Sequence, residues 1–397
     1  MNNLTNNKNQ NSNWKIFNAT DYSSLMYPTF MLCKINGFFP YKITSTIGPS
    51  STKFTVYVIL LAIVIYHTDI SGLIKYNNVP SSLQGHCYLC LGFCIAFVSF
   101  IQNNSRKVLL CKLNDVTSEI PKLKLKRLSI IIHTIEFIGI IFLLVQLLNT
   151  ITNFSQNIYM FLFRLTAMYS TTITYCIDKL YINNTCIVGT CFTTINEKLY
   201  KFKNDLEVNE RHLLRRNYHD KWNPLLLMNI QYIMKQHSDI SKLIVDINEK
   251  FGLQIVASVT LSFIETTFSL YFWILKSVGV TGLDIDRQIW VSYFITSLSY
   301  YTIKLGLMVI MCEECKKQSY KTGVIVHEIL NVTKDREITD ELQIFSLQLL
   351  HHDNTFTAKG LKIDATLLTS IVGGITTYFL ILIQFLMASK SCAEMLG

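Results

Sequence analysis

Residues 376–385 have the sequence TTYFLILIQF, in which two hydroxyl side chains precede a run of large apolar residues and then Gln384. This stretch lies inside a longer apolar block, 365–388, which is long enough for an α-helix to cross a bilayer. A primary amide buried in hydrocarbon costs free energy unless it finds hydrogen-bond partners. Gln384 therefore indicates that one side of this helix faces something other than lipid.

Six further apolar blocks of similar length precede this one. The chain has 397 residues, of which 50% are hydrophobic and only 16% are charged, whereas a soluble protein usually has about a quarter charged residues. The sequence therefore predicts an all-α polytopic membrane protein with seven transmembrane helices. The predicted spans are 53–70, 83–101, 128–148, 158–181, 251–275, 290–311 and 365–388.

The Lys and Arg residues are distributed unevenly between the two sides of these spans. Most of the 36 fall in the N-terminal segment and in the second, fourth and sixth connections. The positive-inside rule then predicts a cytoplasmic N-terminus and an extracellular C-terminus. This topology is the reverse of a G-protein-coupled receptor, and the six prolines lie outside the spans, unlike the broken helices of many secondary transporters. These two classes are the alternatives to a channel.

The connections on the cytoplasmic side have the apolar spacing of packed helices. One stripe comprises Ile240, Leu243, Ile244 and Ile247, and a second comprises Leu342, Phe345 and Leu349. We expect them to form a cytoplasmic helical anchor continuous with the spans. Such helices either shield one another within one subunit or also contact another subunit, and the sequence does not distinguish these cases.

These features divide the chain into six predicted segments. They are a cytoplasmic N-terminal segment with an interfacial helix (1–52), transmembrane helices 1–4 (53–182), a cytoplasmic helical connection (183–250), transmembrane helices 5 and 6 (251–311), a cytoplasmic anchor region (312–364), and the last transmembrane helix with a short extracellular tail (365–397). The interfacial helix is expected within 25–39, an apolar patch too short to cross a bilayer.

Four of the charged residues within the predicted spans are Glu136, Arg164, Glu265 and Lys304, and a charge there is costly unless it has a partner or faces water. At a rise of about 1.5 Å per residue, Arg164 and Glu265 lie in the outer half, and Lys304 and Glu136 lie deeper at similar levels. We expect Arg164 to pair with Glu265 near a ligand pocket, and Lys304 to pair with Glu136 as a structural lock. The alternative is that Arg164 extends outward to the headgroups and that neither pair forms.

Aromatic and hydroxyl side chains crowd the outer halves of the fifth and sixth spans. This pattern suits an interfacial aromatic belt, and it also suits the walls of a pocket for a small organic molecule. The candidate ligand-binding residues are Arg164, Glu265, Thr267, Tyr271, Trp290, Tyr293 and Ser297.

No arrangement of Ser, His and Asp, of paired carboxylates or of metal ligands occurs at catalytic spacing, so we do not expect an enzyme or a cofactor. Cys312 and Cys315 form a CEEC sequence that suggests zinc, but no second Cys or His pair lies nearby in the chain. A reduced cysteine pair at a helix end is the simpler interpretation, and we expect no metal. We also expect no nucleic-acid partner, because no basic stripe with interleaved aromatic residues appears outside the spans.

About fifty C-terminal residues resemble the insect gustatory receptor family. Residues 377–385, TYFLILIQF, match that family's element of Thr, Tyr, five apolar residues, Gln and Phe at every position. Further similar positions are Phe345, Ser346, Gln348, Leu349, Phe356, Thr357, Ala358, Gly360, Asp364 and Leu368. The rest of the chain agrees with the family in length, number of spans and topology.

The resemblance implies a ligand-gated cation channel, homotetrameric or heterotetrameric, in the plasma membrane of a sensory neuron dendrite. Its expected partners are a small-molecule tastant, monovalent and divalent cations, and membrane lipid. The resemblance also implies that the cytoplasmic anchor joins subunits and that ligand binds in an extracellular-facing pocket between the second and sixth helices. The seventh helix would line the pore, with family-motif residues Thr377, Tyr378, Gln384 and Phe385 and pore or gate residues Thr377, Leu380, Ile381, Gln384 and Phe385.

The pore role of Gln384 has a structural alternative. A ring of amides could replace part of the water around a passing cation without fixed charge, and the apolar residues beside it could close the pore by excluding water. In the alternative, the amide joins helices within a packed bundle.

Phe379 bears on the kind of tastant. The sugar-receptor branch of the family often has Glu at this position, directly after Thr and Tyr. Together with the aromatic outer spans, Phe379 favours a bitter plant secondary compound. The alternative is a sugar of the fructose type, because relatives of that type keep an apolar residue there.

Overall fold

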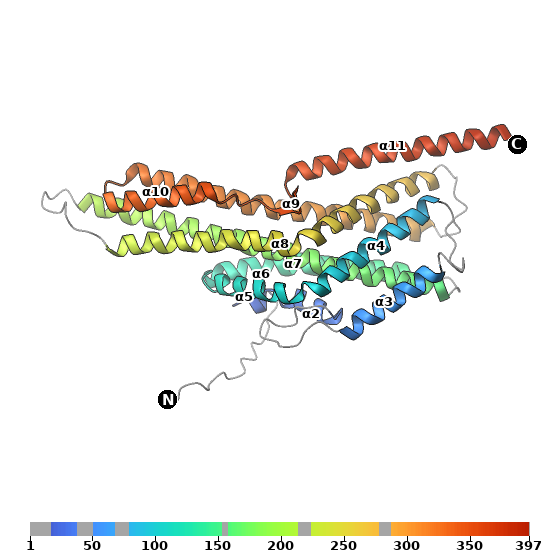
Figure 1. Ribbon diagram of the computed structural model, residues 1–397, viewed down its shortest axis with the longest axis horizontal. Helices are drawn as coiled ribbons and strands as arrows, with labels where there is room; N and C mark the ends of the chain where they lie inside the picture. The colour runs from blue at the N-terminus through green and yellow to red at the C-terminus, as the bar shows by residue number, and fades with distance from the viewer. Residues whose placement is uncertain are drawn as a thin grey trace, which may run out of the picture.

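The computed structural model describes residues 17–37, 51–67, 79–152, 158–212, 224–277 and 287–396. This part of the chain is almost entirely helical, as the sequence predicted (Figure 1). The elements are α1 (Tyr22–Leu25), α2 (Tyr27–Ile35), α3 (Ser51–Ile65), α4 (Val79–Ile101), α5 (Asn103–Thr117), α6 (Lys122–Thr152), α7 (Ile158–His212), α8 (Pro224–Ser277), α9 (Arg287–Val332), α10 (Arg336–His351), β1 (Thr357–Ala358), β2 (Leu361–Lys362) and α11 (Ala365–Leu396).

The described part of every predicted span lies on a helix. In chain order the spans fall on α3, α4, α6, the first part of α7, the last part of α8, the first part of α9, and α11. Five of the described helices are long and apolar enough to cross a membrane, namely α4, α6, α8, α9 and α11, and α3 has a shorter apolar stretch, Thr52–Ile65.

α7 is less apolar than these five helices, because it is the central helix of the bundle. It packs against α3, α4, α6, α8 and α9. Its membrane stretch therefore carries polar side chains such as Ser170, Thr174 and Asp178 that are buried inside the protein instead of facing lipid.

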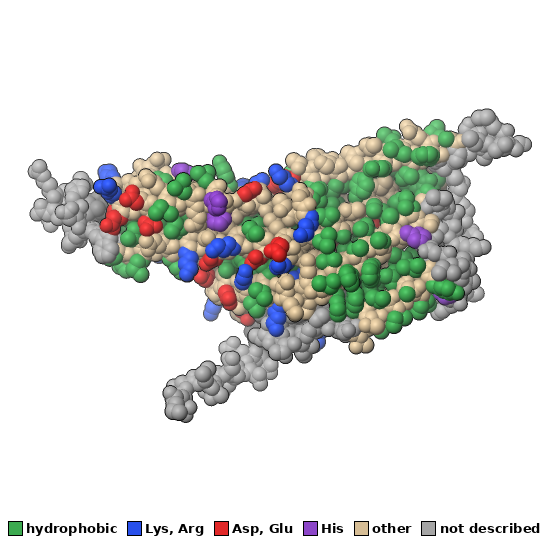
Figure 2. All heavy atoms as spheres, in the orientation of Figure 1, with side chains coloured by type: hydrophobic (Ala, Val, Ile, Leu, Met, Phe, Trp, Pro, Cys, Tyr) green, Lys and Arg blue, Asp and Glu red, His purple; other side chains and the backbone are tan. Residues whose placement is uncertain are grey.

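Three helices continue without interruption from the membrane bundle into a second bundle. α7, α8 and α9 have 55, 54 and 46 residues, and at about 1.5 Å per residue each is far longer than a bilayer is thick. Figure 2 shows Lys, Arg, Asp and Glu gathered over the half of the molecule that holds this second bundle, and hydrophobic side chains over the other half. The second bundle has the position and surface expected of the helical anchor.

The anchor has an apolar core built from the stripes seen in the sequence. Ile240, Leu243, Ile244 and Ile247 of α8 are buried, as are Leu342 and Phe345 of α10. Leu349 is partly buried against the same core. Both predicted stripes therefore face inward.

The described part of the N-terminal apolar patch lies mainly on α2, which directly follows the short helix α1. Asp21 begins α1 with a capping box in which its side chain accepts from the Ser24 backbone amide. Pro28 stands in the first turn of α2, where its missing N–H costs nothing. Tyr27, Met31 and Ile35 follow one exposed side of α2, as expected of a helix lying at a membrane surface. Phe38 and Phe39 lie outside the described residues.

A hairpin of two short strands, β1 and β2, directly precedes α11. Lys359 and Gly360 form its turn with φ of 50° and 92°, and its backbone packs closely on Gly252 of α8, where a Cβ would lie 3.3 Å from the Lys359 nitrogen. Asp364 then accepts from the Thr366 backbone amide at 3.0 Å. This bond satisfies a backbone amide in the first turn of α11, and the Ala365 amide donates to Glu313 of α9 at 3.2 Å.

Candidate functional site

α11 packs against the rest of the chain along one side only, at the edge of the molecule (Figure 1). The contact side carries Gly374, Tyr378 and Leu382, spaced four residues apart. Phe263 of α8 lies 3.0 Å from the position a Cβ would take on Gly374, and its ring centre is 5.7 Å from that of Tyr378. Leu382 packs against Phe268 and its neighbours.

The other sides of α11 are exposed in the single chain although many of their residues are large and apolar. Val372, Phe385 and Met387 are 63%, 71% and 67% exposed. In the most apolar stretch of this helix, only 11% of the residues are buried against the rest of the chain. These surfaces must therefore face lipid, water or another protein chain.

The exposed surface includes a stripe of small and polar residues. It comprises Thr366, Ser370, Gly373, Thr377 and Gln384, with spacings of three, four and seven residues that keep them on one side of a helix. The Thr377 hydroxyl donates to the Gly373 carbonyl at 2.9 Å, so its donor is satisfied within the helix. Leu380 and Ile381 lie between Thr377 and Gln384 on this side.

The structure thus places four of the predicted pore residues, Thr377, Leu380, Ile381 and Gln384, on one exposed face. Tyr378, which directly follows Thr377 in the family element, points instead toward α8. Phe385 is exposed beside Gln384.

In the outer half of the bundle, Glu265 is paired differently from expectation. Its carboxylate is buried and accepts from the Gln84 amide at 2.9 Å. Among the described residues, the side chain that contacts the Glu265 carboxylate is Gln84 of α4, and the half-buried Arg164 lies on α7. The reason is that α4 packs directly on α8 and brings Gln84 to the carboxylate. Depth alone could not reveal which helix is the neighbour.

The remaining candidate ligand residues do not all face one space. Tyr271 packs with Phe268, Leu275 and Leu382 of α11. It lies six residues after Glu265, about 120° around α8, so Glu265 and Tyr271 point to different sides. Thr267 donates to the Phe263 carbonyl at 2.8 Å and Ser297 is buried. The side chains of Trp290 and Tyr293 lie outside the described part of the structure.

The predicted pair of Lys304 with Glu136 is wrong. The Lys304 ammonium lies 3.1 Å from Asp178 Oδ2 and donates to Ser258 Oγ at 2.9 Å. The Ser258 hydroxyl donates to the same carboxylate oxygen at 2.8 Å. α7 packs against α9 along much of its length and so brings Asp178 to Lys304.

Asp178 and Lys179, adjacent residues within the fourth predicted span, are charged residues to which the sequence analysis assigned no partner. Both are buried, and Lys179 donates to the Ile135 carbonyl at 3.3 Å. Glu136 is buried within the electrostatic range of Lys179. The sequence feature that could have revealed them is an acidic and a basic residue side by side in a membrane span, where charges are usually buried with partners.

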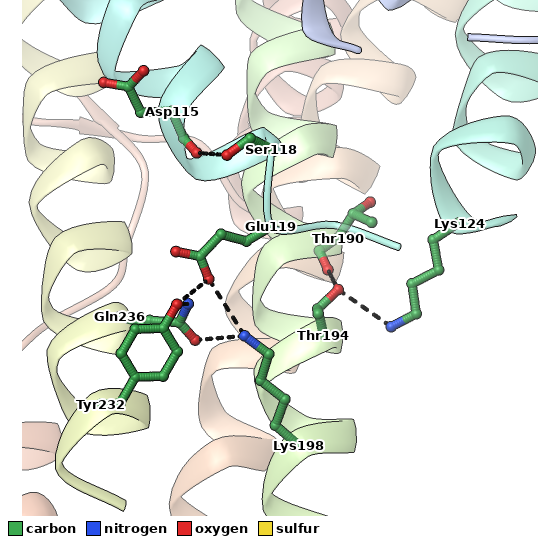
Figure 3. A network of polar contacts seen from close by, with 9 residues as sticks. All are labelled: Asp115, Ser118, Glu119, Lys124, Thr190, Thr194, Lys198, Tyr232 and Gln236. Carbon is green, nitrogen blue, oxygen red and sulfur yellow. Dashed lines mark hydrogen bonds and ion pairs between the residues drawn. The ribbon is translucent and has the colours of Figure 1, made fainter. Parts of the chain in front are cut away.

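A polar network ties the α5–α6 connection to the two long helices α7 and α8 (Figure 3). Glu119 accepts from the Tyr232 hydroxyl at 3.0 Å and from the Lys198 ammonium at 3.4 Å. Lys198 also donates to the Gln236 side chain at 2.8 Å. The connection therefore contacts both α7 and α8.

The described residues include no group of three or more His, Cys, Asp or Glu arranged to hold a metal. Cys312 and Cys315 are buried free thiols. Cys312 shares a 3.4 Å contact with the Tyr181 hydroxyl, and Cys315 packs against Gly189.

Comparison with known proteins identifies a family, two relatives and a protein of similar fold. The family model described as 7tm chemosensory receptor matches residues 26–389. The chain is 35% identical over 159 residues to putative gustatory receptor 28b of Drosophila melanogaster, covering 39% of this chain and 34% of that protein. It is 34% identical over 167 residues to putative gustatory receptor 28a of the same organism, covering 41% and 37%.

These matches span about a third of the length of the two relatives. The fold is similar over a longer stretch to the insect olfactory receptor OR5 from Machilis hrabei, with a TM-score of 0.64 over 91% of this chain and 97% of that one, at 12% identity.

Proposed function

Because the chain belongs to the 7tm chemosensory receptor family, as its resemblance to gustatory receptors predicted, we propose that it is a gustatory receptor acting as a ligand-gated, weakly selective cation channel. The observation that carries this proposal is the exposed stripe of α11. A membrane helix that packs on its own chain along one side, and carries hydroxyls and an amide along another, is suited to line water.

The chemistry of the stripe supports passage of cations. The Gln384 amide offers an oxygen that can replace water around a cation without fixed charge. Leu380 and Ile381, 52% and 39% exposed, lie one turn away. Large apolar side chains at this level can close a narrow pore by excluding water.

A second exposed apolar surface supports assembly. Ile344, Leu347 and Leu350 follow one side of α10 and are 53%, 66% and 80% exposed. α10 and α11 lie along the same edge of the molecule (Figure 1). Apolar patches of this kind mark protein contacts, and burying this edge against like subunits would bring several copies of α11 together. The assembly that we propose is therefore a homotetramer, or a heterotetramer with related receptors, in which the α11 helices of the subunits lie together.

The tastant that we propose is a bitter plant secondary compound that reaches the receptor from outside the cell, in the plasma membrane of a sensory dendrite. Phe379 and the aromatic outer ends of α8 and α9 favour an aromatic or alkaloid ligand. A sugar of the fructose type is the alternative, and recording currents with panels of plant alkaloids and sugars distinguishes them.

The pore assignment is tested by cysteine substitution in the expressed receptor. We expect a charged thiol reagent to block agonist-evoked current at Thr377→Cys and Gln384→Cys, because these positions share the stripe. Phe379→Cys and the unsubstituted receptor, with its native cysteines, are the controls and should stay insensitive.

Gln384→Leu adds a test of selectivity. We expect a several-fold lower conductance and altered permeability ratios, because the amide oxygens would be lost from the pore. Unchanged currents in Gln384→Leu, together with no modification along the stripe, would remove the pore assignment.

A further inference from the structure

Arg106, in the first turn of α5, is a buried cation without an anion among the described residues. It is 2% exposed, and its guanidinium lies 4.8 Å from the centre of the Phe251 ring of α8. Nε and Nη2 have no hydrogen-bond partner in the described part of the chain. Burial lowers the pKa of Arg106 to about 10, which still leaves the group charged at neutral pH. Because a buried charge without a counter-charge is costly, this guanidinium indicates an anion supplied by another molecule.

The two unpartnered nitrogens of Arg106 define the geometry of that anion. Nε and Nη2 direct one N–H each along the same edge of the planar guanidinium, as a parallel pair of donors. Such an edge matches two oxygens of one carboxylate or phosphate group, which accept both hydrogen bonds at once. A single-atom anion offers no such pair of acceptors, so the geometry favours an oxyanion.

Amide oxygens around Arg106 lack hydrogen-bond donors. Gln102 and Asn103 precede Arg106 by four and three residues, on the same side of the helix. Their side-chain oxygens are buried without a partner in the described structure, as is that of Gln254 of α8. The Gln254 amide nitrogen donates to Ser99 Oγ of α4 at 3.5 Å, one turn before Asn103. An occupant with hydroxyl groups as well as an oxyanion can donate to these oxygens.

The residues around Arg106 lie at the cytoplasmic edge of the membrane bundle. Ile101 ends the apolar stretch of α4, and Phe251 is the first residue of the predicted fifth span. Figure 2 shows the surface changing from hydrophobic to charged between the two halves of the molecule. Cys33 of α2, the helix expected at the membrane surface, lies within the electrostatic range of Arg106. The phosphate groups of the inner leaflet lie at this level.

We propose that Arg106 binds the phosphate of an anionic inner-leaflet phospholipid whose headgroup carries hydroxyls, such as phosphatidylinositol. The phosphate accepts from Nε and Nη2 and balances the charge of the guanidinium. The headgroup hydroxyls donate to the side-chain oxygens of Gln102 and Asn103, and the acyl chains remain in the bilayer. The headgroup reaches the covered guanidinium by separating α2 from α5, which breaks few contacts because α2 packs mainly on α6 and α7.

The test uses the purified full-length receptor in nanodiscs of phosphatidylcholine, alone or with added phosphatidylinositol. We expect phosphatidylinositol to raise the unfolding temperature saturably, because a ligand that binds only the folded state stabilises it. Phosphatidylmethanol has the same charge but no headgroup hydroxyl, and it should bind about 2- to 10-fold more weakly. Equal binding of the two anionic lipids, or no effect of phosphatidylinositol, would contradict the proposal.

Inorganic phosphate distinguishes a lipid from a free anion as the occupant. Added to the receptor in phosphatidylcholine nanodiscs, it should leave the unfolding temperature unchanged, because no acyl chain holds it at the membrane. The same stabilisation by inorganic phosphate would show that the site takes a free anion and would overturn the lipid proposal. These measurements need no current, so their failure would leave the proposed channel activity untouched.

A pair of charge-removing variants on α5 locates the site. Arg106→Met should weaken phosphatidylinositol binding about 10- to 100-fold, as loss of hydrogen bonds to a charged group requires. It should remain folded in phosphatidylcholine, because it replaces a buried unpaired charge with an apolar side chain. Lys107→Met removes the same charge from the next residue and should bind phosphatidylinositol as the unsubstituted receptor does. Equal losses in the two variants would indicate attraction to an anionic surface only and contradict the site.

Arg106→Lys decides the question if Arg106→Met fails to fold. It keeps the positive charge but has no parallel pair of donors. We expect it to bind phosphatidylinositol at least about 5-fold more weakly than the unsubstituted receptor. Unchanged binding would show that the guanidinium edge does not hold the phosphate.

Discussion

α7 and α11 are both membrane helices, but the more polar of the two is buried within the chain and the more apolar one is largely exposed. α7 is the more polar helix, and it buries Asp178, Asn183 and Asn184 at the centre of the bundle. α11 is among the more apolar helices, yet it leaves Val372, Phe385 and Met387 exposed. Hydropathy alone therefore ranks these two helices in the wrong order for burial within the chain.

The contrast shows where each helix finds its partners. α7 satisfies its polar groups inside one subunit, through contacts such as Asp178 with Lys304 and Ser258. α11 has contacts along one side only, so the environment of its polar stripe must come from lipid, water or other chains. Substitutions in α7 should therefore affect folding of the single chain, and those on the stripe of α11 should affect function more than folding.

The largest effect is expected for Asp178→Leu in α7. It leaves the buried Lys304 ammonium without its counter-charge, and breaking a buried ion pair in this way costs about 3–5 kcal/mol. We expect little folded receptor, measured as the monodisperse fraction after detergent extraction and as the unfolding temperature.

The double variant Asp178→Leu/Lys304→Met is the matched control. Replacing both charges with apolar side chains removes the unpaired group, so most of the lost stability should return. If the double variant is no more stable than Asp178→Leu, the pair is not the reason for the loss.

An intermediate effect is expected for Gly374→Leu on the contact side of α11. A Cβ there already lies 3.0 Å from the Phe263 ring, and overpacking of this kind costs about 1–3 kcal/mol. Gly373→Leu is its neighbour and control, because a Cβ at Gly373 meets nothing within 4 Å in the chain.

The two glycine variants should differ in thermal stability and in current. Gly374→Leu should lower the unfolding temperature, and Gly373→Leu should keep it but change the agonist-evoked current, because Gly373 lies on the polar stripe. Equal losses of stability in the two variants would mean that α11 packs differently from the arrangement described above.

The sequence predicted what depends on local pattern and missed what depends on helix rotation and neighbours. Apolar length located the seven spans, and the i, i+3, i+4 spacing of Ile240, Leu243 and Ile244 identified the inward side of the anchor helix. Such local patterns did not predict the partners of Glu265 and Lys304. Depth along a helix is encoded in residue number, but the choice of Gln84 and Asp178 as partners depends on which helices pack side by side.

A buried histidine in the anchor should have a smaller, pH-dependent effect. His237 of α8 is fully buried between the rings of Phe192 and Phe345, at centroid distances of 5.3 and 5.6 Å. Neither of its ring nitrogens has a hydrogen-bond partner among the described residues. Burial, with a smaller contribution from His352, lowers the pKa of His237 to about 3.

The consequence for stability follows from proton binding. Between pH 6.5 and 3 the unfolded chain binds a proton at His237 that the folded protein does not, so stability falls as the pH falls through this window, by up to about 1.4 kcal/mol per unit. We expect His237→Leu to reduce the loss of unfolding temperature between pH 7.5 and 5.5. Some loss should remain, because burial also lowers the pKa of His352. His327→Leu, at an exposed position on α9, is the control and should keep the full loss; the same pH dependence in both variants would show that His237 is not the titrating group.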